Sequence, residues 1–163
     1  MSRVIFLFIC TYTFLFSAIV EEFPFIGVTV TTQTIDLKKS STIKETTTAI
    51  QYGKQTVDLR TTFSYEFSGS YSSFNLEIDK ILLDELFGSP KYRPYAGMVV
   101  GVVNYDDNAL NDDSGYYYGA ALGLILYATD TVDADLSYHY YKVEGFEDID
   151  TIKGATVALH YFY

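Results

Sequence analysis

The sequence predicts an all-β fold: an eight-stranded antiparallel up-and-down β-barrel that crosses a membrane. The chain divides into segments of about ten residues in which apolar and polar side chains alternate, as in the strands of a membrane barrel. It contains 16 Tyr and 12 Phe but no Trp, and such rings suit strands and membrane interfaces. The last nine residues repeat the pattern, because Ala155, Val157, Leu159, Tyr161 and Tyr163 share one face opposite Thr156, Ala158 and His160.

The first 22 residues predict export. Arg3 precedes an apolar run from Val4 to Val20, and two glutamates follow it. This arrangement is typical of a secretory signal peptide, expected at 1–18, with an uncleaved N-terminal anchor as the alternative. No later segment approaches the roughly 20 apolar residues of a helical span. The barrel domain is therefore expected at 23–163.

Charge narrows the choice of partners. The formal net charge is -10, from 21 acidic and 11 basic residues. Nucleic acid is excluded because its phosphates would be repelled, and a basic patch for anionic headgroups is not expected. Cys10 lies in the predicted signal peptide, so the mature chain has no cysteine. No cofactor is expected.

The first half of the barrel domain contains four predicted strands, at 25–37, 45–53, 56–68 and 74 to about 83. In the first, Ile26, Val28 and Val30 alternate with small or polar residues. The third is the clearest, because rings and aliphatic groups alternate with Asp58, Arg60 and Glu66. The fourth begins in the same way, but its end also has helical spacing, so a turn or short helical piece through Gly88, Ser89 and Pro90 is expected.

The second half contains predicted strands at 93–104, 116–128, 132–141 and at the end of the chain. Glycines share the inward face of the fifth and sixth strands, as expected where a small barrel leaves little internal room. In the seventh, Val132, Ala134 and Leu136 face outward. Long surface loops are expected at Lys38–Lys44, Gly69–Ser72, Asp106–Ser114 and Lys142–Ile152. Tight turns are expected to alternate with these loops along the chain.

Three segments carry a resemblance to a known family: Arg93–Val102, the turn Ala128–Thr131 leading into Asp135–Tyr140, and the last strand. They resemble the small eight-stranded outer-membrane barrels of the outer-membrane protein A and X type. The resemblance implies a place in the cell outer membrane, contact with its lipid, and an insertion signal read by the barrel insertion machinery at Val157, Leu159, Tyr161 and Tyr163. It says little about activity, because this scaffold hosts many roles.

Inward-facing charges form the candidate site. Eight strands leave an interior just wide enough for side chains, so these groups are expected to form a polar network that fills the lumen. The members are Asp58, Arg60, Glu66, Glu77, Asp79, Arg93, Asp133, Asp135 and His139. The sequence therefore predicts a monomeric barrel with little or no pore activity, in which any leak favours cations because carboxylates outnumber arginines. A porin-like channel for small solutes is the alternative.

Three other hypotheses follow from particular residues. Asp106, Asp107, Asp112 and Asp113 offer oxygen ligands for calcium, but their spacing matches no known binding loop. A lipid A-modifying enzyme would need a nucleophile, a base and an orienting carboxylate, which here would be Ser137, His139 and Glu144. Ser137 and His139 face inward, however, away from lipid.

A secreted lipocalin-like carrier would place the apolar face inside the barrel. Here small and charged residues share one face, which suits a narrow polar interior. We therefore expect a non-enzymatic barrel with a structural or surface-interaction role, in which the acidic loops meet a surface ligand.

Overall fold

The computed structural model describes residues 21–38, 41–69, 71–83, 86–107, 110–145 and 149–163, and within 106–113 only the backbone. The predicted signal peptide lies outside these residues. The described chain forms one closed barrel of eight strands: β1 (Phe23–Leu37), β2 (Thr42–Gln55), β3 (Leu59–Phe67), β4 (Tyr71–Ile81), β5 (Tyr92–Asp107), β6 (Leu110–Tyr127), β7 (Val132–Glu144) and β8 (Ile149–Phe162). Among these residues no helix has the length and apolar character of a membrane span.

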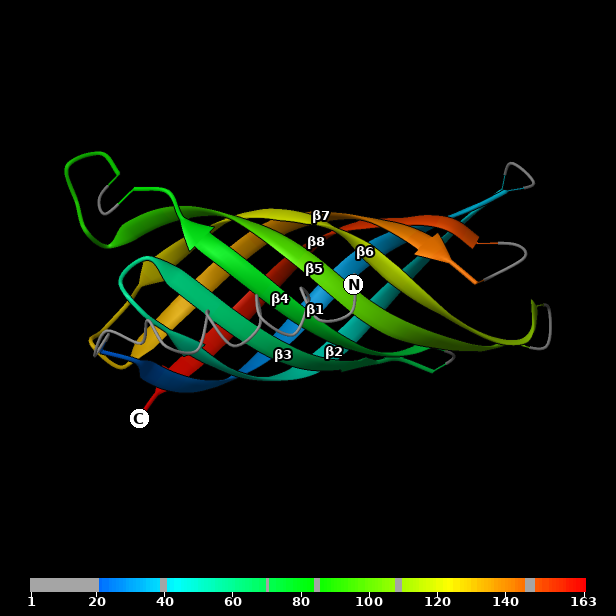
Figure 1. The fold of residues 1–163 in the computed structure, drawn as a ribbon, viewed down its shortest axis with the longest axis horizontal. Helices are drawn as coiled ribbons and strands as arrows, with labels where there is room; N and C mark the ends of the chain where they lie inside the picture. Colours follow the sequence, from blue (N-terminus) through cyan, green and yellow to red (C-terminus); the bar gives the residue numbers. More distant parts are fainter. Residues whose placement is uncertain (1–20, 39–40, 70, 84–85, 108–109, 146–148) are drawn as a thin grey trace, which may run out of the picture.

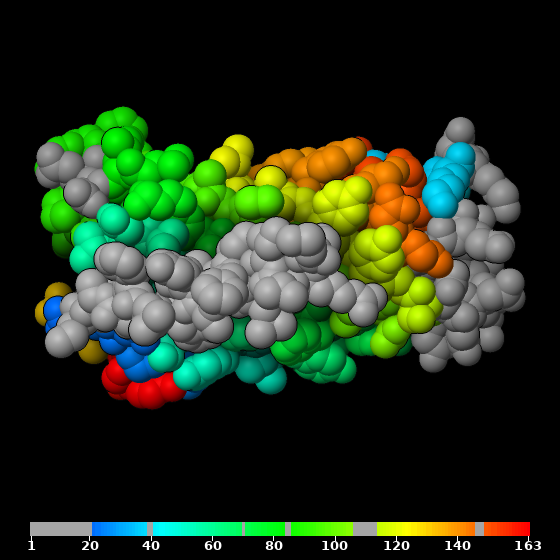
Figure 2. Space-filling model, in the orientation of Figure 1, coloured from blue at the N-terminus to red at the C-terminus, as the bar shows by residue number. Residues whose placement is uncertain are grey.

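Every strand pairs antiparallel with its sequence neighbours, and β1 pairs with β8 from Phe25↔Phe162 onward to close the sheet. The predicted fold is confirmed. The molecule is an elongated cylinder whose strands tilt against its long axis (Figures 1 and 2). The start of β1 and the end of β8 lie together at one end of the cylinder, which we call the terminal end; the opposite end is the far end.

At the terminal end, short turns join β2 to β3 and β6 to β7. In the β2–β3 turn, the Thr56 hydroxyl oxygen accepts a hydrogen bond from the Leu59 amide at 3.0 Å, as threonines in turns often do. The connection after β4 is the longest, and it contains Phe87 and Gly88 at φ 56° and 71° inside a Leu86↔Ser89 bridge. This is a tight turn of the hairpin kind. Of the two predicted alternatives, a turn or a short helical piece through Gly88, Ser89 and Pro90, the described residues form the turn.

The hairpins at the far end are longer than the sequence predicted. β5 continues to Asp107 and β6 starts at Leu110, while β7 reaches Glu144 and β8 starts at Ile149. The loops predicted at Asp106–Ser114 and Lys142–Ile152 are therefore mostly strand. Polar residues there do not break the ladder, because the backbone of each strand end still pairs with its neighbour.

An apolar belt surrounds the barrel. Its members point outward and remain exposed, as Met98 does at 76%; others are Ile26, Val28, Val30, Ile50, Tyr52, Phe63, Tyr65, Phe74, Ile78, Val100, Val102, Leu122, Leu136, Tyr138, Val157, Leu159 and Tyr161. The inward residues of the same strand segments are mostly polar, including Thr29, Ser64 and Asn75. The predicted assignment of faces is confirmed.

Toward the far end the polarity of the two faces reverses, so that polar side chains point outward and apolar side chains point inward. On β1 the outward residues become Thr34 and Asp36, while the inward Ile35 is completely buried. On β8 Lys153 lies outside and Ile152 inside. We call this region the projecting part, formed by residues 32–37, 42–48, 142–144 and 149–155 and by the β5–β6 hairpin beyond residue 103.

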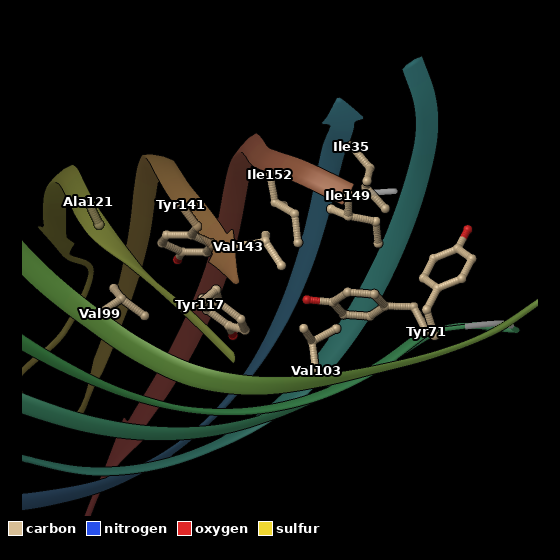
Figure 3. Close-up of a cluster of buried hydrophobic side chains, with 11 residues drawn as sticks. Ile35, Tyr71, Val99, Val103, Tyr117, Ala121, Tyr141, Val143, Ile149 and Ile152 are labelled. Atoms are coloured by element: carbon tan, nitrogen blue, oxygen red, sulfur yellow. The ribbon is translucent and has the colours of Figure 1, made fainter. Parts of the chain in front are cut away.

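The interior of the far end is filled by an outer apolar cluster. Figure 3 shows these side chains converging from several strands inside the barrel. The cluster comprises Ile35, Tyr71, Val99, Val103, Tyr105, Tyr117, Ala121, Tyr141, Val143, Ile149 and Ile152. A smaller inner apolar cluster, Ile81, Tyr95 and Ile125 with Tyr127 packed against it, lies toward the terminal end. The lumen is thus partly apolar, which the sequence analysis did not predict.

Candidate functional site: the filled lumen

A buried arginine joins opposite walls of the barrel. Arg60 on β3 reaches β7, four strands away around the sheet, where it donates to Asp135 and Asp133 at 2.8 Å each. Its Nε donates to Gln55 at 2.8 Å, and its guanidinium carbon lies 5.4 Å from the centre of the Phe25 ring. These charge-assisted bonds fix the distance between the two walls.

His160 belongs to the same network. Its Nδ1 lies 2.7 Å from Asp133 and its Nε2 lies 2.8 Å from Gln51 Oε1. The Gln51 amide nitrogen in turn donates to Ser64 at 3.1 Å. Tyr95 donates a further hydrogen bond to Asp135 at 3.0 Å.

A second polar group lies next to the outer apolar cluster. Glu66 accepts hydrogen bonds from Thr47 and, at 3.4 Å, from Ser73. Tyr117 receives a 3.1 Å bond from the Asn75 amide, and its ring stacks on Tyr141 with centroids 4.9 Å apart. Tyrosines therefore form the boundary between the polar and the apolar part of the lumen.

A small cavity of about 50 Å³ lies within the polar part of the lumen. Glu77, Asp79 and His139 line it, and neither Asp79 Oδ1 nor His139 Nε2 has a hydrogen-bond partner among the described residues. Such a space holds only a few water molecules. A buried carboxylate without a cation is costly unless it takes up a proton or meets water, so water in this cavity would complete the network.

Buried side chains from both apolar and polar groups fill the lumen among the described residues. Arg60 and Phe25 are 2% and 0% exposed, and Val103 in the outer apolar cluster is 1% exposed. This filled interior can hold the walls together.

Two of the predicted lumen residues lie elsewhere. Asp58 is in the β2–β3 turn, exposed to solvent and 3.2 Å from Lys80, because β3 begins only at Leu59. Arg93 lies at the mouth of the terminal end, 5.3 Å from the Tyr127 ring centre. The other seven lie in the interior: Arg60, Glu66, Glu77, Asp79, Asp133, Asp135 and His139.

Four further residues belong to the network although the predicted set of lumen residues did not contain them: His160, Tyr95, Gln51 and Gln55. Their inward parity was readable, since His160 alternates with the outward Leu159 and Tyr161. Neutral residues and an isolated histidine give no charge signal, so parity alone did not single them out.

The residues of the enzymatic hypothesis do not form a catalytic group. His139 stacks on Tyr141 with ring centroids 4.4 Å apart, and Glu144 lies on the outward face. In the described part of the chain no hydrogen bond joins Ser137, His139 and Glu144. The same residues contain no group of three His, Cys, Asp or Glu side chains placed to hold a metal. The predicted calcium ligands fall within 106–113, whose side chains are not described.

Charged pairs cover the outside of the projecting part. Lys153 lies 2.8 Å from Asp36, and Lys142 pairs with Asp150. The Lys153 ammonium, with a hydrogen bond from Thr151, holds the pKa of Asp36 below its usual range. Charges of this kind are stable in water and costly in hydrocarbon, so the projecting part stands outside the membrane.

Comparison with known proteins rests on structure alone. No protein-family model matches the chain, and no curated protein matches it either. Among solved structures, Neisserial surface protein A has 14% identity and a TM-score of 0.66, covering 86% of this chain and 97% of that one. Outer membrane protein H of P. aeruginosa has 17% identity and a TM-score of 0.63, covering 86% and 99%.

A third structure is Ail, the attachment invasion locus protein of Yersinia pestis, in complex with the heparin analogue sucrose octasulfate, with 11% identity, a TM-score of 0.55 and coverage of 88% and 99%. The chain has the fold of the small outer-membrane β-barrels. A closed barrel of this fold with an exposed apolar belt spans a membrane, and bacterial barrels of this kind are proteins of the outer membrane.

Proposed function

We propose that this outer-membrane protein is a closed, monomeric barrel with a structural or surface-interaction role, rather than a pore. The observation that carries the proposal is the projecting part, which has a packed apolar interior and a polar exterior. Its paired strands extend beyond the apolar belt, so its contact surfaces are formed by a rigid β-sheet and not by long loops. The projecting part would then face outward from the cell.

The acidic β5–β6 hairpin is the part of this surface that we assign to a ligand. It carries Asp106, Asp107, Asp112 and Asp113 in a chain of net charge -10. Ail was solved with a sulfated ligand, but this charge opposes a polyanion. The surface therefore favours a basic ligand, and sucrose octasulfate should not bind.

Insertion of the barrel is the other contact that we propose. The outward face of β8 presents Val157, Leu159 and Tyr161, each more than half exposed, and Tyr163 follows β8 in the chain. These side chains would meet the insertion machinery before they meet lipid.

Planar-bilayer recording of the refolded protein tests the closed lumen. We expect no stable channel, and at most a small cation-selective leak. A large or anion-selective conductance would refute this part of the proposal.

Labelling of whole cells tests orientation. Cysteine placed by Asn104→Cys should react with a membrane-impermeant maleimide, whereas the control Thr129→Cys, in the turn before β7 at the terminal end, should react only after the cells are opened. The reverse pattern would contradict an outward-facing projecting part.

A further inference from the structure

Arg93 at the terminal end has a charge that the described structure does not use. It lines a pocket of about 230 Å³ at the mouth of the barrel. Its Nε hydrogen is buried without an acceptor among the described residues, and its guanidinium lies over the Tyr127 ring. By contrast Arg60, in the network, has acceptors on all three nitrogens. Arg93 therefore has unused capacity to bind an anion.

The lining of this pocket combines that cation with apolar groups and one acid. Phe23, Val57 and Phe162 provide the apolar wall, and Asp130 lines the same space without forming an ion pair with Arg93. The pocket is far larger than the about 10–15 Å³ that one water molecule needs. Opposite charges that share a pocket but do not meet suit a ligand with an anionic and a cationic group.

A second cavity, of about 330 Å³, shares the lining residue Thr56 with this pocket. It lies on the outside of β2 and β3, where Tyr52, Leu59 and Phe63 form its apolar wall and the ion pair of Glu22 and Lys54 lines it as well. Because this face contacts hydrocarbon, an acyl chain is the natural occupant of the apolar wall. The two cavities, one on the lipid-facing wall and one at the mouth, share Thr56 of the β2–β3 turn and together outline a path for one ligand.

We propose that this path binds one phospholipid with a zwitterionic headgroup from the leaflet at the terminal end. The phosphate binds the Arg93 guanidinium, the headgroup ammonium meets Asp130, and an acyl chain lies against Tyr52, Leu59 and Phe63. A guanidinium suits phosphate because its donors match the phosphate oxygens. The inference rests on the proposed membrane location, but not on conductance, on orientation or on a surface ligand.

The chain has three arginines, Arg3, Arg60 and Arg93, which makes a selective measurement straightforward. The full chain, labelled with ¹⁵N-arginine and refolded in a sugar detergent without phosphate, is titrated with dihexanoyl phosphatidylethanolamine. The Arg93 Nε–H signal, assigned by its loss in Arg93→Gln, should shift in a saturable way. The Arg60 signal is the internal control and should stay in place.

Binding by calorimetry adds the energetic test. Arg93→Gln should weaken binding at least about tenfold, because a hydrogen-bonded charge is lost, while Arg93→Lys should retain part of the affinity. Phosphatidylglycerol lacks the ammonium and should bind less tightly. Diacylglycerol lacks the phosphate and should not move the Arg93 signal. Gel migration before and after boiling shows that each variant is folded.

Three results would overturn the proposal: an unmoved Arg93 signal at saturating lipid, equal affinity of folded Arg93→Gln, or phosphoethanolamine binding as tightly as the lipid, which would indicate a free anion site. Equal affinity for phosphatidylglycerol would overturn the assignment of Asp130. A pore detected in the bilayer recording would refute the proposed function and leave these results unaffected.

Discussion

The membrane part and the projecting part of this barrel are built from the same strands, but with opposite patterns. On β5, Met98, Val100 and Val102 point outward in the belt, whereas farther along the same face Asn104 points outward and Val103 is buried. Hydrocarbon around the first part requires apolar side chains outside, and water around the second requires them inside. The solvent changes along the strand, so the pattern reverses while the backbone ladder continues.

The two parts also fill their interiors in different ways. The membrane part holds Arg60, Asp133 and Asp135 as paired charges, with His160 hydrogen-bonded to Asp133, whereas Ile35, Val143, Ile149 and Ile152 of the outer apolar cluster fill the projecting part. Paired charges fix geometry but stabilise little relative to a well-packed apolar core. Stability should therefore depend on pairing in the first region and on packing in the second.

The largest effect is expected from breaking the arginine network. Arg60→Gln leaves Asp133 and Asp135 short of a cation in a buried site, and should lower the free energy of unfolding by about 3–5 kcal/mol. Urea unfolding from detergent micelles measures this. Lys80→Gln, which removes a lysine from an exposed pair, is the control and should change little. Equal loss in both variants would mean that the network contributes no more than a surface pair.

The next effect comes from the outer apolar cluster. Ile152→Ala removes a completely buried side chain and should cost about 2–5 kcal/mol. Leu159→Ala changes the outward face of the same strand in the belt, where the lost contact is with lipid, and should cost less. The same unfolding measurement compares them. A larger loss at Leu159 would show that the projecting part lacks a packed core.

A glycine tests how tightly the interior is filled. A Cβ at Gly119 would collide with the Tyr140 carbonyl oxygen and lie 2.8 Å from Tyr141 Cα, so Gly119→Ala should destabilise the barrel by about 1–3 kcal/mol. Gly69→Ala is the matched control, because nothing lies within 4 Å of its Cβ position. A loss at both positions, or at neither, would contradict this packing.

The smallest effect belongs to the half-buried pair of Asp36 and Lys153. The folded-state pKa of Asp36 is lowered by Lys153 from the ordinary value of 3.8. The contribution of the pair is therefore complete above that value and disappears as pH falls through the lower, folded pKa. Melting curves of wild type and Lys153→Gln should differ slightly at pH 7 and converge in acid. A difference that grows in acid has the wrong sign for this pair.

The sequence predicted the closed barrel and the direction of its faces because alternation over eight segments is a repeated signal. It placed Arg60, Asp133 and Asp135 inside for the same reason. It did not predict the outer apolar cluster, because an inward Val143 or Ile149 in a polar stretch resembles a loop residue when the membrane boundary is unknown. Arg60 binds Asp133 and Asp135 on β7, although Asp79 is its neighbour on the adjacent strand. The sequence could not predict this pairing, because it depends on distances across the lumen that no pattern along the chain encodes.

The most direct test of the solvent reversal compares one substitution at two outward positions of β5. Met98→Lys places a charge in the belt and should lower the free energy of unfolding from lipid vesicles by about 2–4 kcal/mol if the position is near the bilayer centre. Asn104→Lys places it in the projecting part, beside Ser72 and Ser114, and should change stability little. Equal costs at the two positions would contradict the account, because both would then face the same solvent.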